Sequence, residues 1–257
     1  MRDNPLKARL AAGETAFGTM VFDFYTPGLP ALLANAGADF ALYDMEHSGA
    51  SLSDMKAQFA LCRGAGITPL VRPPGKDYQF IARLLDVGAF GVMAQMVESA
   101  EEAKRLVSYT RYPPVGVRGA MAGAGHDDWD FGTALTDMMA TSNARTMVIA
   151  LIETAKGIRN VDEIMAVDGI DVGHLGHADL SMSMGIAGQF DHPDFKAAVE
   201  LLLDAARRHD KTAGCLAPTL EMGRAWLDQG FRMMSYQFDA MLLHGALSAG
   251  IAALKKG

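Results

Sequence analysis

Charged side chains follow directly after short apolar segments of this sequence, at the points where apolar packing stops. Asp44, Glu46 and His47 follow one such segment, and Arg72 ends the next. Flanking carboxylates are suited to orienting an imidazole and raising its basicity, as a proton carrier requires. Arg72 places a positive charge at the equivalent point of the next segment. These residue types indicate a site where His47 could transfer a proton.

Two further carboxylates occupy equivalent positions later in the chain. Glu153 ends an apolar run, so its side chain is expected to leave the strand toward an open face, and Asp179 lies just beyond the next apolar segment. Carboxylates from neighbouring strands are hard oxygen ligands that suit Mg²⁺ or Mn²⁺ held together with water and substrate. A helix N-cap or a salt bridge is the structural alternative for either acid.

The cation and the histidines also have structural alternatives. Arg72 could pair with Asp44 or Glu46 for stability alone, and His47 could be a solvated loop residue. His174 lies within the apolar segment at residues 171–176 and His177 follows it directly, and the sequence by itself assigns them no role. Their chemistry depends on which side chains the fold brings beside them.

The elements that must position these residues alternate between short apolar segments and longer amphipathic ones, which is the pattern of βα units. Eight strands are expected, at residues 17–21, 40–44, 68–72, 91–94, 147–153, 171–176, 213–217 and 233–237. Amphipathic helices are expected at residues 51–63, 79–87, 99–109, 193–209 and 220–229.

Eight such units in 257 residues predict a single (β/α)8 TIM barrel domain spanning residues 1–257. In that fold the carboxyl ends of all strands meet on one face, which would gather the scattered charged residues into one site. A doubly wound sheet would usually carry a glycine-rich nucleotide loop after its first strand, and none follows residues 17–21. The glycine-rich stretch at residues 111–129 is interpreted as a long functional loop.

Composition narrows the partners and the compartment. The 30 acidic and 23 basic side chains give a net charge of −7, which disfavours binding to nucleic acid or an anionic membrane surface. Cys62 and Cys215 are too few for a disulfide scaffold and lack metal-ligand spacing. No apolar run approaches the ~20 residues of a membrane span, and the N-terminus lacks the core of a signal peptide. We expect a cytoplasmic protein that acts on small molecules.

Six ordered blocks of sequence resemble the HpcH/HpaI aldolase family, the metal-dependent class II pyruvate aldolases that cleave 4-hydroxy-2-oxo acids. The resemblance extends from about Gly18 to the C-terminal segment. The blocks include Asp-Met-Glu-His-Ser, Val-Arg-Pro-Pro, Glu-Thr and Gly-His-Ala-Asp-Leu-Ser, and they lie at residues 44–48, 71–74, 96–102, 111–119, 153–154 and 176–181.

The resemblance implies roles for individual residues. Glu153 and Asp179 would bind a divalent ion, Mg²⁺, Mn²⁺ or Co²⁺, and Arg72 would contact the pyruvate oxygens. His47 with Asp44 would move protons. The backbone of the 176–181 block, at Gly176, Ala178 and Asp179, would hold the substrate carboxylate. The resemblance also implies a homo-oligomer, a hexamer built as a trimer of dimers, in which neighbouring barrels exchange the C-terminal helix.

The sequence departs from the family pattern around the expected pocket. Many members carry Gln where this chain has Leu151, whose side chain should point into the barrel on the same side as Glu153. His177 replaces the Pro of the family's Gly-Pro-Ala-Asp block, and His174 lies close by. We hypothesise that these two histidines line the aldehyde side or adjust the surroundings of the metal, replacing the polar function lost at Leu151.

The expected activity is a reversible retro-aldol cleavage of a 4-hydroxy-2-oxo acid to pyruvate and an aldehyde. No expected strand contains a lysine, which agrees with a metal-assisted and not a Schiff-base mechanism. Two alternatives stay open: a CoA-thioester lyase related to the citrate-lyase β subunit, and a non-catalytic barrel that binds an oxo acid. The first would need a basic rim for the CoA phosphates, for which residues 111–118 are the one candidate.

Overall fold

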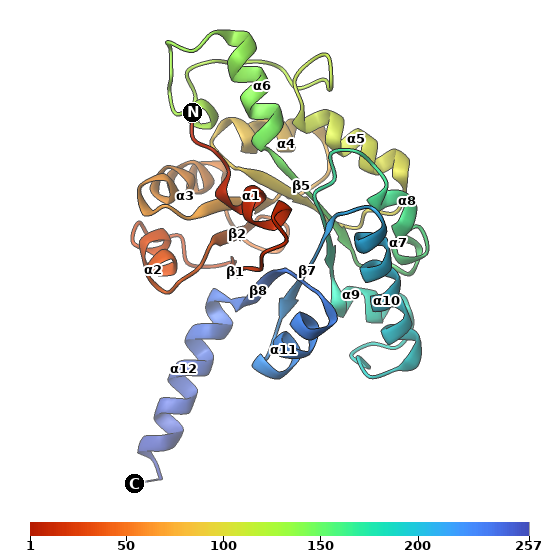
Figure 1. The fold of residues 1–257 in the computed structure, drawn as a ribbon. Coiled ribbons are helices and arrows are strands. Elements are labelled where there is room, and N and C mark those ends of the chain that lie inside the picture. Colours follow the sequence, from red (N-terminus) through yellow and green to blue (C-terminus); the bar gives the residue numbers. More distant parts are fainter. Residues whose placement is uncertain (257) are drawn as a thin grey trace.

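A closed barrel of eight parallel strands forms the centre of the molecule, in a computed structural model that describes residues 1–256 (Figure 1). Each strand pairs with its sequence neighbours, and β8 pairs with β1 to close the ring. The strands are β1 (Ala16–Val21), β2 (Phe40–Asp44), β3 (Thr68–Arg72), β4 (Gly91–Ala94), β5 (Met147–Ile152), β6 (Val172–Leu175), β7 (Thr212–Ala217) and β8 (Met233–Phe238). The predicted (β/α)8 fold is confirmed, and every predicted strand matches within one residue at each end.

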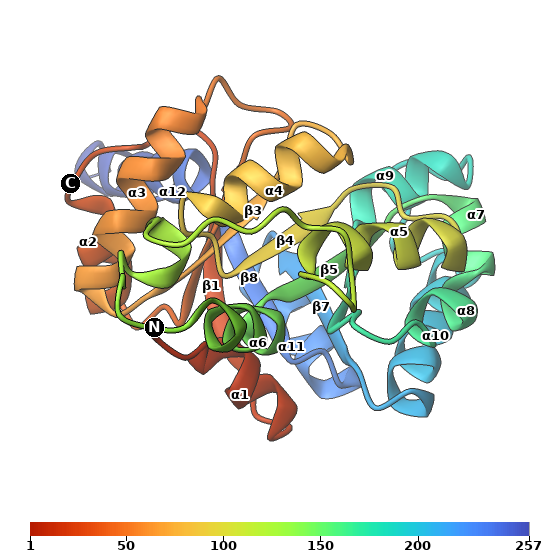
Figure 2. The same ribbon diagram turned by 90° about the horizontal axis from the view of Figure 1, so that it is seen from above.

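Helices surround the barrel and connect successive strands (Figure 2). They are α1 (Pro5–Ala11), α2 (Leu29–Asn35), α3 (Leu52–Ala65), α4 (Tyr78–Asp86), α5 (Ala100–Thr110), α6 (Leu135–Arg145), α7 (Ala155–Arg159), α8 (Val161–Met165), α9 (His177–Ser183), α10 (Pro193–Arg208), α11 (Leu220–Gln229) and α12 (Asp239–Leu254). Ser51, Ser99 and Thr219 each accept a hydrogen bond from a first-turn N–H and so fix where α3, α5 and α11 begin. The five predicted helices match within two residues.

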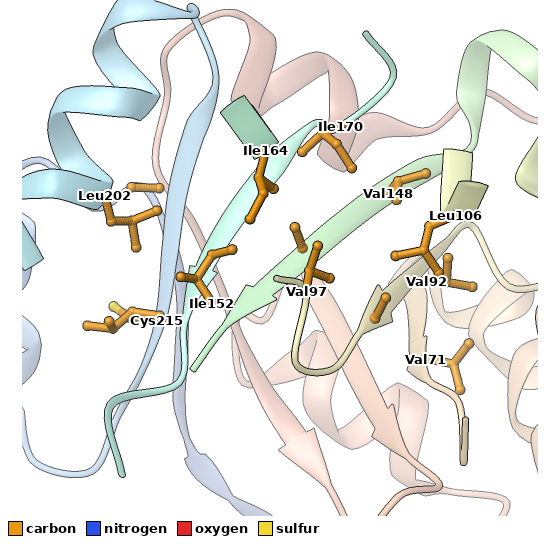
Figure 3. Close-up of a cluster of buried hydrophobic side chains, with 14 of the residues drawn as sticks. Val71, Val92, Val97, Leu106, Val148, Ile152, Ile164, Ile170, Leu202 and Cys215 are labelled. Atoms are coloured by element: carbon orange, nitrogen blue, oxygen red, sulfur yellow. The ribbon is translucent and has the colours of Figure 1, made fainter. Parts of the chain in front are cut away.

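The two faces of each strand enter two different cores, because side chains alternate along a strand. On β5, Met147, Ile149 and Leu151 face the barrel interior, where they join an inner apolar cluster. Val148 and Ile152 belong to the larger cluster between the barrel wall and the helices (Figure 3). Both faces are therefore apolar, which explains why these strands are continuous apolar runs in the sequence.

The amino-terminal end of the barrel is closed by α1 and by the connection between α5 and β5. Leu6 and Leu10 of α1 pack into the inner cluster. The stretch at residues 111–129, interpreted from sequence as a functional loop, lies in this region beside the N-terminus (Figure 2). Its Asp128 accepts the backbone N–H of Arg2 and pairs with Arg63 at the end of α3. None of residues 111–129 lines the cavity at the carboxyl-terminal end of the barrel, so the loop takes no part in that site, and a separate function for it stays a prediction.

The last helix, α12, points away from the barrel (Figure 1). Of its residues only Asp239 is buried, and Leu243, Leu247 and Leu254 are exposed by 56%, 59% and 85%. An apolar helix that finds no partner within its own chain is a surface available for association. None of the helices among the described residues is long and apolar enough to span a bilayer.

We predict that Gly91→Ala destabilises the barrel. Gly91 lies between Leu70 of β3 and Met147 of β5, and an added Cβ would come within 2.8 Å of the Met147 Cβ. Overpacking of this kind costs about 1–3 kcal/mol, measurable as a lower midpoint in urea unfolding. Gly64→Ala on the exposed side of α3 is the control, because its Cβ would meet nothing within 4 Å. Equal midpoints for the two variants would contradict the prediction.

Candidate active site

A cavity of about 350 Å³ opens at the carboxyl-terminal end of the barrel. It is lined by apolar side chains from several strands and by most of the residues that the sequence singles out. Those residues are His47, Arg72, Leu151, Glu153, His174, Gly176, His177, Ala178 and Asp179. Of the predicted site residues, only Asp44 does not line the cavity. Residues separated by more than a hundred positions therefore meet because all eight strands run in the same direction.

The guanidinium of Arg72 is buried and held by two carboxylates. Asp44 and Arg72 end neighbouring strands in register, and the Nε of Arg72 donates to the fully buried Asp44 carboxylate. The Nη1 of Arg72 lies 3.0 Å from Oε2 of Glu46. A cation buried in a protein interior is stable only when it is paired, so these acids make Arg72 tolerable in the cavity wall. Arg72 therefore forms the salt bridges with Asp44 and Glu46 that the sequence allowed, and its side chain still lines the cavity.

His47 is the most exposed of the polar residues at this site, with 61% of its side chain accessible. Its backbone N–H donates to Oδ2 of Asp44 at 2.8 Å, while its imidazole Nε2 lies 3.7 Å from Oε2 of Glu46. Asp44 thus fixes the β2–α3 turn and Arg72, and Glu46 is the carboxylate that faces the imidazole. From the sequence, either Asp44 or Glu46 could orient the imidazole of His47. In the structure Asp44 contacts the backbone of His47 and Glu46 lies beside its ring.

Glu153 is 4% exposed and its carboxylate lies at the end of β5. Its Oε1 accepts the backbone N–H of Met96 at 2.8 Å. Gly176 leaves room for this carboxylate, because a Cβ there would lie 2.5 Å from the Glu153 Cβ and 2.7 Å from Oε2. Burial, together with the negative charges of Asp179 and Glu46, raises the pKa of Glu153 to about 7.

The charge balance of the cavity suits a cation. Glu153 and Asp179 both line the cavity, and the negative charge of Glu46 acts on Glu153 as well. Arg72 is the one buried cation near these acids, and it is already paired with Asp44. Two carboxylates with excess negative charge match the donor chemistry of a divalent ion that keeps water or substrate oxygens as its other ligands. Within residues 1–256 no three acidic, histidine or cysteine side chains form a complete protein metal site.

Leu151, His174 and His177 all line the cavity. Leu151 and His174 are register partners on β5 and β6, and both side chains face inward, as predicted for Leu151. His177 begins α9, where its ring lies 5.1 Å from that of Phe190 and 5.3 Å from that of Trp226. Burial lowers the pKa of His177, an effect that Asp179 opposes.

Sequence reasoning missed the backbone of Met96 and a buried acid at the start of α12. Met96 has a φ of 47°, a left-handed conformation that is uncommon outside glycine, and this directs its N–H at Glu153. Asp239 accepts the backbone N–H groups of Asp23 and Phe24 at 2.9 and 2.8 Å, which holds the turn that brings Phe22 to the cavity. The position of Asp239 directly before an apolar helix was the only available signal.

A family model described as HpcH/HpaI aldolase/citrate lyase matches residues 25–246. The chain belongs to this family. A hydroxypyruvate/pyruvate aldolase from Roseobacter denitrificans is 36% identical over 244 residues, which cover 94% of this chain and 93% of that protein. A 5-keto-4-deoxy-D-glucarate aldolase from Shigella boydii is 33% identical over 253 residues, covering 98% and 97%. The resemblance inferred from the six sequence blocks is confirmed.

Solved structures agree with this assignment. The crystal structure of an HpcH/HpaI aldolase from Desulfitobacterium hafniense matches with a TM-score of 0.94 and 30% identity, covering 100% of this chain and 98% of that one. A citrate lyase β subunit from M. tuberculosis matches with a TM-score of 0.56 and 21% identity, covering 90% and 94%, which shows a shared fold only. The protein is therefore an aldolase or lyase of the HpcH/HpaI family.

The raised pKa of Glu153 predicts a pH-dependent stability in metal-free protein. An acid whose pKa is raised on folding stabilises the folded state at low pH, and this stability is lost as pH rises from about 4.5 to 7. In chelator-treated protein, Glu153→Gln should therefore be more stable than wild type at pH 8, by up to about 3 kcal/mol, and nearly equal at pH 4.5. Urea unfolding at the two pH values measures this, and a difference that does not change with pH would contradict it.

Proposed function

We propose that this chain catalyses the reversible retro-aldol cleavage of a 4-hydroxy-2-oxo acid to pyruvate and an aldehyde, with a divalent metal ion bound by Glu153 and Asp179. One observation supports this above all. A single cavity at the carboxyl end of the barrel combines these two carboxylates, the buried Arg72 and the accessible His47. Cleavage of this kind needs a sink for the electrons of the broken bond and a base for the C4 hydroxyl proton.

Arg72 and the start of α9 would bind the oxo acid. The guanidinium supplies a fixed positive charge in a wall where water is largely excluded, so its attraction for substrate oxygens is stronger than in bulk water. The N–H groups of Ala178 and Asp179 lie in the first turn of α9, where no helical acceptor is in reach, and they can donate to the substrate carboxylate.

His47 would act as the base. Its imidazole would take the proton of the C4 hydroxyl, after which the C3–C4 bond breaks and its electron pair forms the enolate of pyruvate while the aldehyde leaves. C3 of the enolate then takes up a proton, which completes pyruvate. A positioned base typically contributes a factor of about 10² to 10⁴ in rate. When bound, a cation at Glu153 and Asp179 would supply Lewis-acid stabilisation of the enolate charge.

The alternative function, a CoA-thioester lyase, required a basic rim at residues 111–118 that could bind the CoA phosphates. Arg118 is 2% exposed and pairs with Asp86, and Arg111 is 5% exposed and donates to Thr110 and Gly169. Neither guanidinium is free to bind a CoA phosphate. The non-catalytic oxo-acid sensor is separated from the aldolase by turnover, since a sensor would release no pyruvate.

A panel of 4-hydroxy-2-oxo acids that differ in the aldehyde they release would identify the aldehyde half of the substrate. The two named relatives act on hydroxypyruvate/pyruvate and on 5-keto-4-deoxy-D-glucarate, so short hydroxyaldehydes and sugar-acid aldehydes head this panel. His177, half-buried at the mouth of the cavity between two aromatic rings, is our candidate for contact with the aldehyde. Coupled measurement of pyruvate release tests the whole panel.

We predict that activity depends on a divalent ion. Chelation should abolish pyruvate release, and Mg²⁺, Mn²⁺ or Co²⁺ should restore it. Glu153→Ala should lose both bound metal, measured by atomic emission, and at least 99% of the rate, on the order of the effects of removing a metal ligand or its support. Glu14→Ala removes an exposed acid and should keep both. A Glu153→Ala protein with normal metal content and rate would overturn the assignment.

The second prediction separates His47 from Arg72. His47→Ala should lower kcat by about two decades or more while metal content stays normal, because only the base is lost. Arg72→Ala should also raise KM, because pyruvate loses its cation, and it should lower stability by about 3–5 kcal/mol, since the Asp44 carboxylate is left buried and unpaired. Steady-state kinetics and urea unfolding measure both effects. Similar kinetic profiles for the two variants would contradict the separate roles.

We further expect a homo-oligomer in which α12 packs against a second copy of the chain, up to the hexamer that the family resemblance implies. Leu247→Glu should lower the mass of the species seen by light scattering at micromolar concentration. The substitution places a charge on the face of α12 that the expected oligomer would bury. Leu32→Glu is the matched control, since Leu32 is 63% exposed on α2. A monomeric wild-type protein would contradict this expectation.

A further inference from the structure

His174 carries two ring nitrogens that have no hydrogen-bond partner among the described residues. The side chain is 2% exposed and lines the cavity from β6. Buried polar groups are almost always hydrogen-bonded, and leaving one unpaired costs about 1–3 kcal/mol. An imidazole of this kind at the wall of a binding cavity therefore marks a position where something else completes its hydrogen bonds.

The strands beside His174 make room for the ring and give it no side-chain partner, although the backbone of Leu175 and Cys215 lies near enough to act on its pKa. On β7, Gly214 pairs with His174 in register, and a Cβ there would lie 2.9 Å from the Cδ2 of the imidazole. On the other side, the register partner is the apolar Leu151 of β5. The chain thus accommodates a full imidazole next to two residues that can neither donate to it nor accept from it.

The ring is neutral. Burial, with the positive charge of Arg72 and the neighbouring His177, lowers the pKa of His174 to about 3. A neutral imidazole offers one N–H donor and one nitrogen acceptor. A hydroxyl group can both accept and donate, so it can satisfy either nitrogen, whereas a carboxylate can only accept. A hydroxyl group is therefore the one complement that fits either nitrogen in either tautomer of the ring.

The depth of His174 indicates which part of a substrate it would meet. His174 lies two residues before Gly176, the glycine that packs against the Glu153 carboxylate, and its neighbour Leu151 lies two residues before Glu153. It is therefore farther inside the barrel than the two acids. The aldehyde half must leave toward the exposed His47 and the cavity mouth. A group that reaches past the acids belongs to the oxo-acid half, whose only substitutable carbon is C3.

We propose that His174 determines donor specificity by binding a hydroxyl group on C3 of the 2-oxo acid. This inference rests on the proposed aldolase function and adds the identity of the donor to it. Leu151 and the inner methionines Met20 and Met93 would then provide the apolar surroundings that strengthen this hydrogen bond.

The test compares three donors with one fixed aldehyde, glycolaldehyde, and saturating Mn²⁺. Hydroxypyruvate carries the C3 hydroxyl, 2-oxobutanoate carries a methyl group of similar size, and pyruvate carries neither. The measured quantity is the ratio of kcat/KM for hydroxypyruvate to that for 2-oxobutanoate. We expect His174→Leu to lower this ratio by about tenfold or more, the effect of one lost hydrogen bond. His174→Gln keeps a donor and an acceptor and should retain the ratio within about threefold.

A matched control removes another unpartnered polar atom from the barrel. Thr68 is 2% exposed at the amino-terminal end of β3, its Oγ1 has no partner among the described residues, and it does not line the cavity. Thr68→Val should leave the donor ratio unchanged. The wild-type ratio should also stay constant between pH 6 and 9, because the imidazole remains neutral throughout.

The inference fails if wild type favours 2-oxobutanoate, if His174→Leu leaves the ratio unchanged, or if all three donors lose activity equally in that variant. If His174→Leu does not fold, the wild-type ratio and His174→Gln decide the matter. Calorimetric binding of the same three acids to the metal-loaded protein gives a second ratio that needs no turnover. Absence of turnover with a normal binding preference would contradict the proposed function and leave the His174 inference standing.

Discussion

Pairing of β8 with β1 is the constraint on which the rest of the molecule depends. Once the ring is closed, every second side chain of each strand lies inside a narrow cylinder, and all eight carboxyl ends lie at the same end. Glycine therefore occurs where the side chains of neighbouring strands leave no room for a Cβ, as at Gly91 between Leu70 and Met147. The same closure brings β2, β3, β5 and β6 around one cavity, although their residues are spread over most of the chain.

The low polarity of the barrel wall explains why the buried charged residues at its carboxyl end occur together. Arg72 could not be buried alone, and Asp44 at the register-paired position of β2 compensates it directly. Asp44 also accepts the backbone N–H of His47, so one carboxylate fixes both the cation and the loop that presents the imidazole. The remaining acids of the cavity, Glu153 and Asp179, form no salt bridge with a cation among residues 1–256, which is the condition that a divalent ion would meet.

The hydrogen-bonding atoms at the inner part of the cavity lie on β6 and not on β5. Leu151 is apolar where the family pattern often has glutamine, and its register partner His174 carries the hydrogen-bonding atoms. Side chains at paired positions on adjacent parallel strands lie close to each other, so His174 places its polar atoms beside the apolar Leu151. Gly214 on the next strand provides the volume that the imidazole needs.

The sequence by itself predicted the eight strands, the fold class and four charged or titratable residues that line the cavity, His47, Arg72, Glu153 and Asp179, because these depend on local patterns. Apolar runs such as 147–152 end where a charged residue follows, and strand direction alone places Glu153 and Arg72 on a common face. Only the tertiary structure decided that Asp44 binds Arg72 and the His47 backbone while Glu46 faces the imidazole. It also decided that the 111–129 stretch lies at the opposite end of the barrel, and that the Met96 N–H meets Glu153. These contacts depend on distances of about 3 Å between segments far apart in sequence, and the periodicity of a single strand carries no information about them.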